Sequence, residues 1–321
     1  MPIPGPATAL FAGQDLAITF RTDSNVDQAD LDELVVLATL SPPVSADAGA
    51  PSPMTDAGRP PPASDASSPP PPGPGNDSGP PPAPVSGWWR PTPGTSWQWQ
   101  ISGALDTRVA VSVYDIDLYN SSAADIAGLQ AQGRKVICYF DTSYEPGRPE
   151  SATLLPYIGN PYQGWPGQYW LDIRQPAVVS VMLGRIDLAK QKGCDAIEAD
   201  SVDAFHNNPG FNFTLDDQRR FILTLARAAH ARGISYGLKN DLDDISNVLS
   251  EVDFSINEEC AKYNECDRLS PFVAANKAVF DAEYGPDLAA TAAQVCPALN
   301  ARNFDGIVKN LSLDAPRVAC R

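Results

Sequence analysis

Residues 193–203 read Gly-Cys-Asp-Ala-Ile-Glu-Ala-Asp-Ser-Val-Asp, and this stretch is the most informative one in the chain. In a β-strand alternate side chains share a face, so Glu198 and Asp200 point to one side and the apolar residues between them to the other. Two acids on one face cannot be buried at low cost unless they are paired or used in chemistry. The stretch therefore predicts a strand that delivers carboxylates to its carboxyl end.

Similar segments recur on both sides of this strand. Short apolar runs alternate with helical patterns from residue 88 onward, as in repeated βα units. Helices are predicted at 124–132, 178–192 and 215–232, and each is followed by a glycine that suits a helix C-terminus. The candidate strands are 97–101, 111–117, 135–141, 169–173, 195–200, 235–240, 254–258, 277–284 and 306–310. Nine candidates for eight places imply one extra strand, and 169–173 is the weakest candidate.

Almost every candidate strand ends in a polar residue. These residues are Asp115, Asp117, Asp141, Asp172, Asp200, Lys239, Asn240, Glu258, Glu283 and Lys309. A common register of this kind is typical of the rim of a (β/α)8 barrel, where barrel enzymes hold their catalytic side chains. A doubly wound sheet would also place ligands at strand ends, but no Gly-rich phosphate loop follows any strand here. We therefore predict an α/β fold, a (β/α)8 TIM barrel, over residues 88–321.

The region before the barrel has a different composition. Of the 32 prolines, 19 precede residue 87. Residues 41–87 consist largely of Pro, Ser, Gly and Asp and hold too little apolar surface to offset the entropy of ordering. We predict a disordered linker there, preceded by a segment, 1–40, whose structure the sequence does not define.

The charge of the chain is strongly acidic, with a formal net charge of −16. Such a surface repels nucleic acid and attracts cationic ligands, although acidity can also serve solubility alone. No run approaches the ~18 apolar residues of a membrane span. Residues 1–20 lack a basic region followed by an apolar core, so no signal peptide is expected in them.

Six cysteines lie in the barrel region, and their spacing suggests disulfides. Cys260 and Cys266, and likewise Cys296 and Cys320, are spaced like cysteines that close short loops. Six cysteines permit fifteen pairings, so sequence leaves the pairing of Cys138 and Cys194 open. Paired cysteines and a long linker together indicate an extracellular or cell-envelope protein. The cysteines contain no C-x2-C motif, so zinc is not expected.

Carboxylates are the reactive side chains that remain as candidates for catalysis. His206 and His230 are the only histidines, and no G-x-S-x-G motif supports a serine triad. Glycoside hydrolysis needs two carboxyl groups beside the scissile bond and neither metal nor cofactor. Asp200 and Glu258, at the ends of two candidate strands, are the predicted pair. Glu198 could instead form an ion pair with Lys239 of the next strand.

Several motifs resemble those of glycoside hydrolase family 114, the endo-α-1,4-polygalactosaminidases. They lie at 113–118, 136–140, 170–174, 193–203, 237–241, 257–260 and 263–266. The resemblance runs from about residue 88 to 320 and implies a TIM barrel that hydrolyses α-1,4-linked galactosamine in an exopolysaccharide. It assigns the catalytic aspartate to Asp200 and the catalytic glutamate to Glu258.

The resemblance also implies which residues line the cleft. It assigns substrate binding to Asp117, Tyr139, Asp172, Lys239 and Asn240. To these we add Glu198 and Asp203 from the stretch 193–203. The chain departs from the family pattern at Ser201, at Phe205 and in the loop 144–148. We expect a monomer with an amino-sugar polysaccharide as its partner. The alternatives are a barrel that binds polysaccharide without cutting it and a hydrolase of another α-linked glycan.

Overall fold

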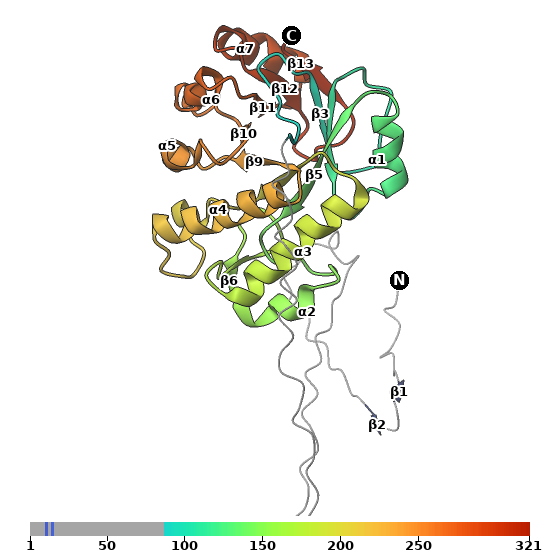
Figure 1. Cartoon of the computed structure of the whole chain (residues 1–321), viewed down its shortest axis with the longest axis vertical. Helices are drawn as coiled ribbons and strands as arrows, with labels where there is room; N and C mark the ends of the chain where they lie inside the picture. Colours follow the sequence, from blue (N-terminus) through green and yellow to red (C-terminus); the bar gives the residue numbers. More distant parts are fainter. Residues whose placement is uncertain (1–9, 12–13, 16–86) are drawn as a thin grey trace, which may run out of the picture. The chain divides into compact units, whose positions relative to one another are not determined.

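The computed structural model describes residues 10–11, 14–15 and 87–321 (Figure 1). Strands β1 (Leu10–Phe11) and β2 (Gln14–Asp15) form a short antiparallel pair. Otherwise the segment 1–40 and the linker expected at 41–87 lie outside the described residues, apart from Gly87. Residues 87–321 form the barrel and the elements around it.

A nine-stranded sheet forms a nearly closed barrel, and eight of its strands run parallel. The parallel strands, in their order around the sheet, are β3 (Trp97–Gln100), β4 (Val113–Asp117), β5 (Lys135–Asp141), β8 (Ala196–Asp200), β9 (Ser235–Lys239), β10 (Phe254–Glu258), β11 (Val279–Tyr284) and β12 (Asp305–Lys309). The predicted TIM barrel is confirmed, and each of these strands overlaps a candidate from the sequence.

The ninth strand lies at one edge of this nearly closed sheet. β13 (Arg317–Ala319) pairs antiparallel with β12, and the sequence pattern had not indicated it. Residues of this C-terminal segment then reach β3 across the remaining gap. Leu313 O accepts hydrogen bonds from the backbone N–H of Ile101 and Ser102 at 3.1 and 3.3 Å. The candidate strand at 169–173 lies outside the barrel, where β7 (Tyr169–Leu171) pairs with β6 (Ile158–Pro161).

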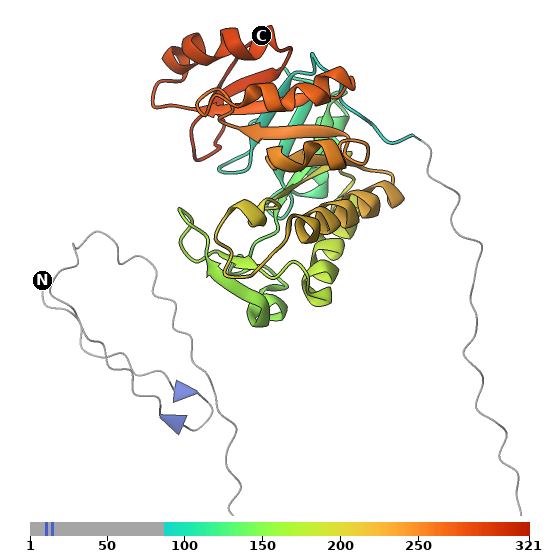
Figure 2. The same cartoon turned by 90° about the vertical axis from the view of Figure 1, so that its left-hand side faces the viewer.

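Helices cover the outside of the barrel (Figures 1 and 2). Those in residues 87–321 are α1 (Ala123–Gln130), α2 (Ser151–Leu154), α3 (Pro176–Lys192), α4 (Leu215–Ala231), α5 (Ile245–Val248), α6 (Ser270–Ala274) and α7 (Leu288–Ala301). Thr214 and Asp217 form a capping box that fixes the start of α4. Gly193 ends α3 with φ 92°, a left-handed conformation that glycine adopts without strain.

The strands alternate between two apolar layers, as the period of the sequence requires. Inside the barrel, Trp97, Phe254 and Phe280 pack together with small aliphatic side chains. Residues of the opposite parity, such as Ile197 and Ala199, face the helices. The barrel interior is filled so tightly that a Cβ on Gly237 would lie 2.4 Å from the Phe254 ring. This packed interior supports the polar side chains at the strand ends.

Three disulfides join the described cysteines in pairs. Cys260–Cys266 and Cys296–Cys320 are the two pairs predicted from spacing. The third, Cys138–Cys194, links β5 to the residue just after α3 and encloses a sequence separation of 56 residues. None of the helices in the described part of the chain is both long and apolar enough to cross a membrane.

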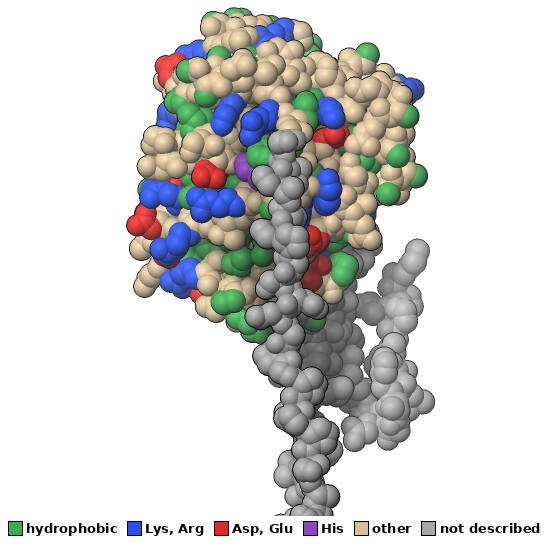
Figure 3. Space-filling view, viewed as in Figure 1, with side chains coloured by type: hydrophobic (Ala, Val, Ile, Leu, Met, Phe, Trp, Pro, Cys, Tyr) green, Lys and Arg blue, Asp and Glu red, His purple; other side chains and the backbone are tan. Residues whose placement is uncertain are grey.

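The barrel face that holds the amino ends of the strands receives residues 87–91. Trp88 Nε1 donates to Asp253 Oδ1 at 3.1 Å, and its ring stacks on His230 with centroids 4.2 Å apart. Pro91 O accepts from the N–H of Ala278 at 3.1 Å. On the face in Figure 3, basic side chains are interspersed with acidic ones, so the acidic excess of the chain is not gathered there.

Candidate active site

A cavity of about 740 Å³ opens where the parallel strands end. Strand-end residues form its floor, and the loops that follow them form its walls. The floor residues include Trp99, Asp117, Tyr139, Asp141, Asp200, Lys239, Glu258 and Tyr284. This is the end of a TIM barrel at which catalytic groups are found.

Lys239 occupies the centre of this floor. Its side chain is almost fully buried, and its Nζ lies 3.0 Å from Glu198 Oε1, 3.1 Å from Asp200 Oδ1 and 3.2 Å from Glu258 Oε2. It also lies 4.7 Å from the centre of the Trp99 ring. Burial by itself would lower the pKa of Lys239, but the three carboxylates together raise it well above the usual value. The side chain is therefore a permanent cation that links three strands.

Asp200 accepts hydrogen bonds at both of its oxygens. Oδ2 accepts from the hydroxyl of Tyr139 at 3.0 Å, and Oδ1 accepts from the N–H of Ser201 at 2.7 Å in addition to its contact with Lys239. Burial raises the pKa of Tyr139 well above its usual value, and the charge of Asp200 raises it further. Tyr139 thus stays a neutral donor. These contacts hold Asp200 in one orientation.

Glu258 is held by fewer donors and is slightly more exposed. Tyr284 donates its hydroxyl to Oε1, and Lys239 contacts Oε2. The backbone N–H of Glu258 donates to Asn240 Oδ1 at 3.1 Å, which ties the end of β10 to the end of β9. The side chain is 28% exposed, against 21% for Asp200. Both carboxylates therefore reach the cavity from a fixed backbone.

The backbone turns sharply directly after each of these residues. Ser201, Asn240 and Glu259 have φ values of 59°, 48° and 59°, in the left-handed region. That conformation is unfavourable for residues other than glycine, although the penalty is smaller for asparagine. Conformations of this kind persist only where the surrounding structure enforces them, and they cluster at functional sites. Here they separate the strand-end residues from the wall loops.

Three other acids of the cavity have raised pKa values. Burial raises the pKa of Asp203 and of Asp141 to about 6, and the neighbouring charge of Asp200 contributes in both cases. Burial raises the pKa of Asp241 to about 7, with the charge of Asp244 adding to the effect. Perturbed carboxyl groups gathered in one cavity are typical of a catalytic site.

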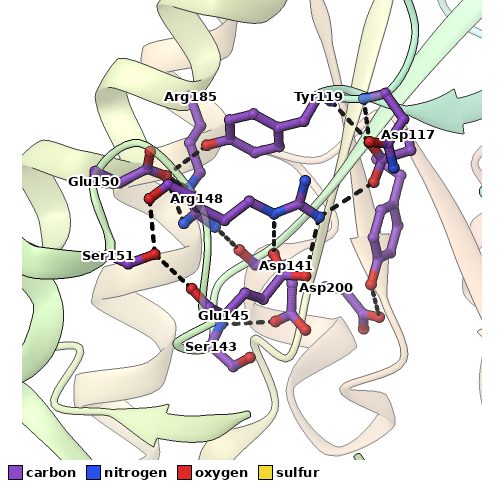
Figure 4. Close-up of polar contacts among 12 residues, drawn as sticks. Asp117, Tyr119, Asp141, Ser143, Glu145, Arg148, Glu150, Ser151, Arg185 and Asp200 are labelled. Carbon is purple, nitrogen blue, oxygen red and sulfur yellow. Dashed lines mark hydrogen bonds and ion pairs between the residues drawn. The ribbon is translucent and has the colours of Figure 1, made fainter. Parts of the chain in front are cut away.

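One wall of the cavity is held by Arg148 (Figure 4). Its Nε and Nη2 donate to the two oxygens of Glu145, each at 3.0 Å, and Nη2 lies 3.5 Å from Asp117 Oδ2. The guanidinium lies over the Tyr119 ring at 4.4 Å. This arrangement fixes the loop that follows β5 against the end of β4. The loop is one of those in which the sequence departs from the family pattern.

The structure brings most of the predicted site residues together. Asp117, Tyr139, Asp200, Asp203, Lys239, Asn240 and Glu258 all line the cavity. Two of the others do not reach its wall. Asp172 is bound by Arg174 at 2.8 Å and by Gln175 at 2.9 Å, and Glu198 is fully buried beneath Lys239 in the ion pair considered from the sequence.

Sequence reasoning missed three residues of the site. Asp141, which pairs in register with Asp200, was noted only as one strand end among many. Tyr284 is the last residue of a correctly placed strand, but a tyrosine there carries no recognisable signal. Arg148 lies in a loop, and only the loop's departure from the family pattern drew attention to it. Nothing in the sequence pattern fixes its contacts with β4.

A group with possible metal-ligand geometry lies next to the site. Cys260, Asp281 and Glu283 place one ligand atom each within 4.8 Å of one another. The sulfur of Cys260 is bonded to Cys266, so no thiolate is available. Glu283 instead accepts a hydrogen bond from the N–H of Ala261 at 2.6 Å, which supports the loop after Glu258.

Comparison with known proteins decides the family. The model of glycoside hydrolase family GH114 matches residues 79–321, which is most of the chain. The chain belongs to glycoside hydrolase family 114. It is therefore a glycosidase, and its two central carboxylates match the residue types on which such enzymes rely.

Two solved structures are informative relatives of this family 114 protein. Ega3 of Aspergillus fumigatus, determined in complex with galactosamine, is 39% identical with a TM-score of 0.70, and the match covers 72% of this chain and 97% of that one. The glycoside hydrolase domain of PelA from Pseudomonas aeruginosa is 14% identical with a TM-score of 0.58, covering 70% and 97%. The second likeness extends to the fold alone. A search of curated proteins gave no significant match.

Proposed function

We propose that this chain is an endo-acting hydrolase of α-1,4-linked galactosamine in an exopolysaccharide, with Asp200 as nucleophile and Glu258 as general acid. The observation that carries the proposal is the pair of carboxylates held around Lys239 at the floor of an acidic cavity. The 39% identity to a protein crystallised with galactosamine supports the sugar.

The charge of the cavity fits a cationic amino sugar. Ten of its lining residues are Asp or Glu, whereas the permanent cations are Lys239, Arg148 and Arg268. Each of these cations is already paired with carboxylates: Arg148 with Glu145, and Arg268 with Asp243. The net field is therefore negative and attracts the ammonium groups of a deacetylated chain.

Exposed aromatic side chains at the cavity suit a chain of sugars. Trp165 is 49% exposed and Tyr263 is 61% exposed, and both line the cavity. Large aromatic faces left in solvent provide stacking surfaces for sugar rings, and for ammonium groups they add a cation–π attraction. They lie on wall loops outside the catalytic floor, so they can hold units of a polymer beyond the bond that is cut.

The contacts of the two carboxylates support their different roles. Asp200 receives three donors and is held as an anion, as a nucleophile must be. Glu258 receives two and is the more exposed, so it can exchange a proton with a leaving group or with water. Tyr284 can rotate its hydroxyl to accept a hydrogen bond when Glu258 is protonated.

The spacing of the pair supports retention of anomeric configuration. Asp200 Oδ1 and Glu258 Oε2 both lie within 3.2 Å of the same nitrogen atom, so they are no more than about 6.4 Å apart. Retaining enzymes hold their carboxyl groups at ~5–5.5 Å, whereas inverting enzymes need ~6.5–9.5 Å to admit water between them. The upper limit for this pair of oxygens lies just below the inverting range.

In the first step Asp200 attacks the anomeric carbon while Glu258 gives its proton to the glycosidic oxygen, which leaves with the bonding electrons. The product is a glycosyl ester of Asp200. In the second step Glu258 removes a proton from water, the water oxygen bonds to the anomeric carbon, and Asp200 leaves as a carboxylate. Lys239 stabilises the carboxylate that is released.

The test is incubation of the purified protein with partly deacetylated α-1,4-galactosamine polymer. We expect oligosaccharides by mass spectrometry, and proton NMR of the first products should detect the α-anomer. Asp200→Asn and Glu258→Gln should each lower turnover by at least ~10²-fold, the scale for loss of a positioned acid or base. Glu198→Gln is the matched control, with a smaller loss of turnover and a larger loss of stability.

Other outcomes would overturn specific parts of the proposal. Polymer that is bound but never cut would support the binding barrel. Cleavage of a fully acetylated polymer alone, or of another α-glycan alone, would replace the substrate. A β-anomer as first product would exclude Asp200 as a nucleophile that forms an ester.

A further inference from the structure

Beneath Lys239 lies a second pair of carboxyl groups that the mechanism does not use. Asp115 is on β4 and Glu198 is on β8, and both side chains point into the barrel with no exposed surface. The two carboxyl groups are in hydrogen-bonding contact with each other. Neither lines the cavity, so neither can contact the sugar.

This pair lacks hydrogen-bond donors. Among the described residues, no N–H or O–H group donates to either oxygen of Asp115 or to Oε2 of Glu198. Only Oε1 of Glu198 is satisfied, by Lys239. A buried carboxylate without any donor is strongly unfavourable, and two carboxylates in contact also repel each other. Two acceptors can form a hydrogen bond only when one of them holds a proton.

We propose that Asp115 is a positioning residue for Lys239: it holds a proton in the resting enzyme and donates it in a hydrogen bond to Oε2 of Glu198. Glu198 then remains an anion with both of its oxygens satisfied. Its Oε2 accepts the hydrogen bond from Asp115, and its Oε1 holds the ammonium of Lys239 at 3.0 Å.

The charges around the pair determine which member is protonated. The charged groups that face Asp115 are Glu198 and Asp200 on β8 and Lys239 on β9. Burial raises the pKa of Asp115 well above its usual value, and the contact with Glu198 raises it further. Burial also raises the pKa of Glu198, to about 7, but Lys239 and the bond from Asp115 oppose that increase. Glu198 accepts a hydrogen bond from the cation of Lys239, whereas neither oxygen of Asp115 has a donor among the described residues, so the proton belongs to Asp115.

The inference rests on the proposed function, because its consequence is the placement of Lys239 between Asp200 and Glu258. Were Glu198 neutral, Lys239 would be attracted only by the two catalytic carboxylates. It would then pair more closely with the nucleophile and make it less reactive. The buried proton thus keeps the lysine at a distance that still allows Asp200 to attack.

Two substitutions at one position separate this role from simple packing. Asp115→Asn keeps an N–H donor for Glu198, so turnover should stay within about threefold of the wild type and the pH profile should not move. Asp115→Leu has a similarly branched, somewhat larger side chain and no donor, so turnover at neutral pH should fall at least about tenfold. Its activity should recover as pH rises, because Glu198 then loses the proton that it had taken up.

An infrared measurement tests the proton itself and needs no substrate. At neutral pH the difference spectrum between the wild type and Asp115→Asn should contain one carbonyl band of a protonated carboxylic acid, over the signal that other buried acids such as Asp241 give in both proteins. Absence of that band from the difference spectrum, or an equal loss of turnover in both variants, would overturn the proposal. If no polymer is cut by any variant, the proposed function fails instead, while the infrared result still decides the state of Asp115. That result also stands if Asp115→Leu does not fold.

Discussion

Acidic side chains have different surroundings at the two ends of the barrel. At the amino ends of the strands, Asp253 is bound by Arg90 at 2.8 Å and by His230 at 2.7 Å and also accepts from Trp88 and from the N–H of Tyr236. At the carboxyl ends, Asp200, Glu258 and the buried Glu198 share the single cation Lys239. Asp253 has its own set of hydrogen-bond donors, whereas the three acids at the other end share one cation.

The proton affinities follow this difference. Hydrogen bonds from His230, Tyr236 and Trp88 outweigh burial and lower the pKa of Asp253. Burial and neighbouring acids raise the pKa of Asp203 at the other end to about 6. Asp305 is an exception among the acids near the amino ends, because burial raises its pKa to about 6 despite Arg321.

The fold thus separates stability from chemistry at its two ends. Residues at the amino ends of barrel strands are expected to stabilise the fold, and those at the carboxyl ends to act on substrate. Crowded carboxylates and left-handed residues at the carboxyl ends are unfavourable arrangements that a packed barrel can support.

Replacing Lys239 should affect both properties at once. Lys239→Met removes the cation shared by three carboxylates, so the free energy of unfolding should fall by about 3–5 kcal/mol. Turnover should fall at least ~10²-fold. The loss of stability should be greater at about pH 8 than at about pH 5, because the remaining carboxyl groups can be neutralised by protons only at the lower pH.

Lys309 offers a matched control for this substitution. It is also fully buried at the end of a barrel strand, but its Nζ binds neutral oxygens, those of Gln98 and Asp314 O. Lys309→Met should leave turnover within about threefold of the wild type at temperatures where it is folded. Equal losses of turnover in the two variants would contradict a special role for Lys239.

The disulfides should differ in what they stabilise. Cys138–Cys194 closes a loop of 56 residues away from the cavity, and Cys260–Cys266 closes one of 6 residues directly after Glu258. Loop entropy predicts a loss of about 4 kcal/mol for removing the first and about 2 kcal/mol for the second. Turnover should fall only for the second, as measured with paired Cys→Ala variants. The reverse order in stability would show that strain or unfolded-state structure dominates.

Stability should fall as pH rises from about 4 to about 7. Asp141, Asp203 and Asp241 have folded-state pKa values of about 6 to 7, above the ~3.9 of an unfolded aspartate. The folded state therefore binds more protons in this window, and that stabilisation is lost as the groups ionise. Asp203→Asn and Asp241→Asn should each reduce the slope and stabilise the protein at pH 7 by about 1–3 kcal/mol. Thermal unfolding across pH measures this, and an unchanged slope would contradict it.

The smallest effect expected is that of salt on activity. If the acidic cavity recruits a cationic chain, kcat/KM should fall a few-fold as sodium chloride rises above ~0.1 M, where exposed charges are screened beyond ~10 Å. A flat profile would assign the acidic charge to solubility alone. Fully acetylated polymer is the control, since it offers no ammonium groups.

The sequence was sufficient to predict the barrel, because the two-residue period and the polar strand end recur from one strand to the next. It placed all eight parallel strands and brought Asp200, Lys239 and Glu258 to one rim, since residues at the ends of parallel strands must meet. It could not foresee β13 or the wall formed by Arg148, which depend on loop conformation. It also could not show that Asp172 turns toward Arg174, because local pairing competes with the cleft for the same carboxylate.

The most direct test is to neutralise one acid at each end of the barrel and measure both properties. Glu258→Gln should lower turnover at least ~10²-fold while leaving the free energy of unfolding unchanged or higher. Asp253→Asn should leave turnover within about threefold where it is folded and lower the free energy of unfolding by about 2 kcal/mol. A Glu258→Gln protein that keeps most of its turnover, or a folded Asp253→Asn protein that loses as much, would contradict the account.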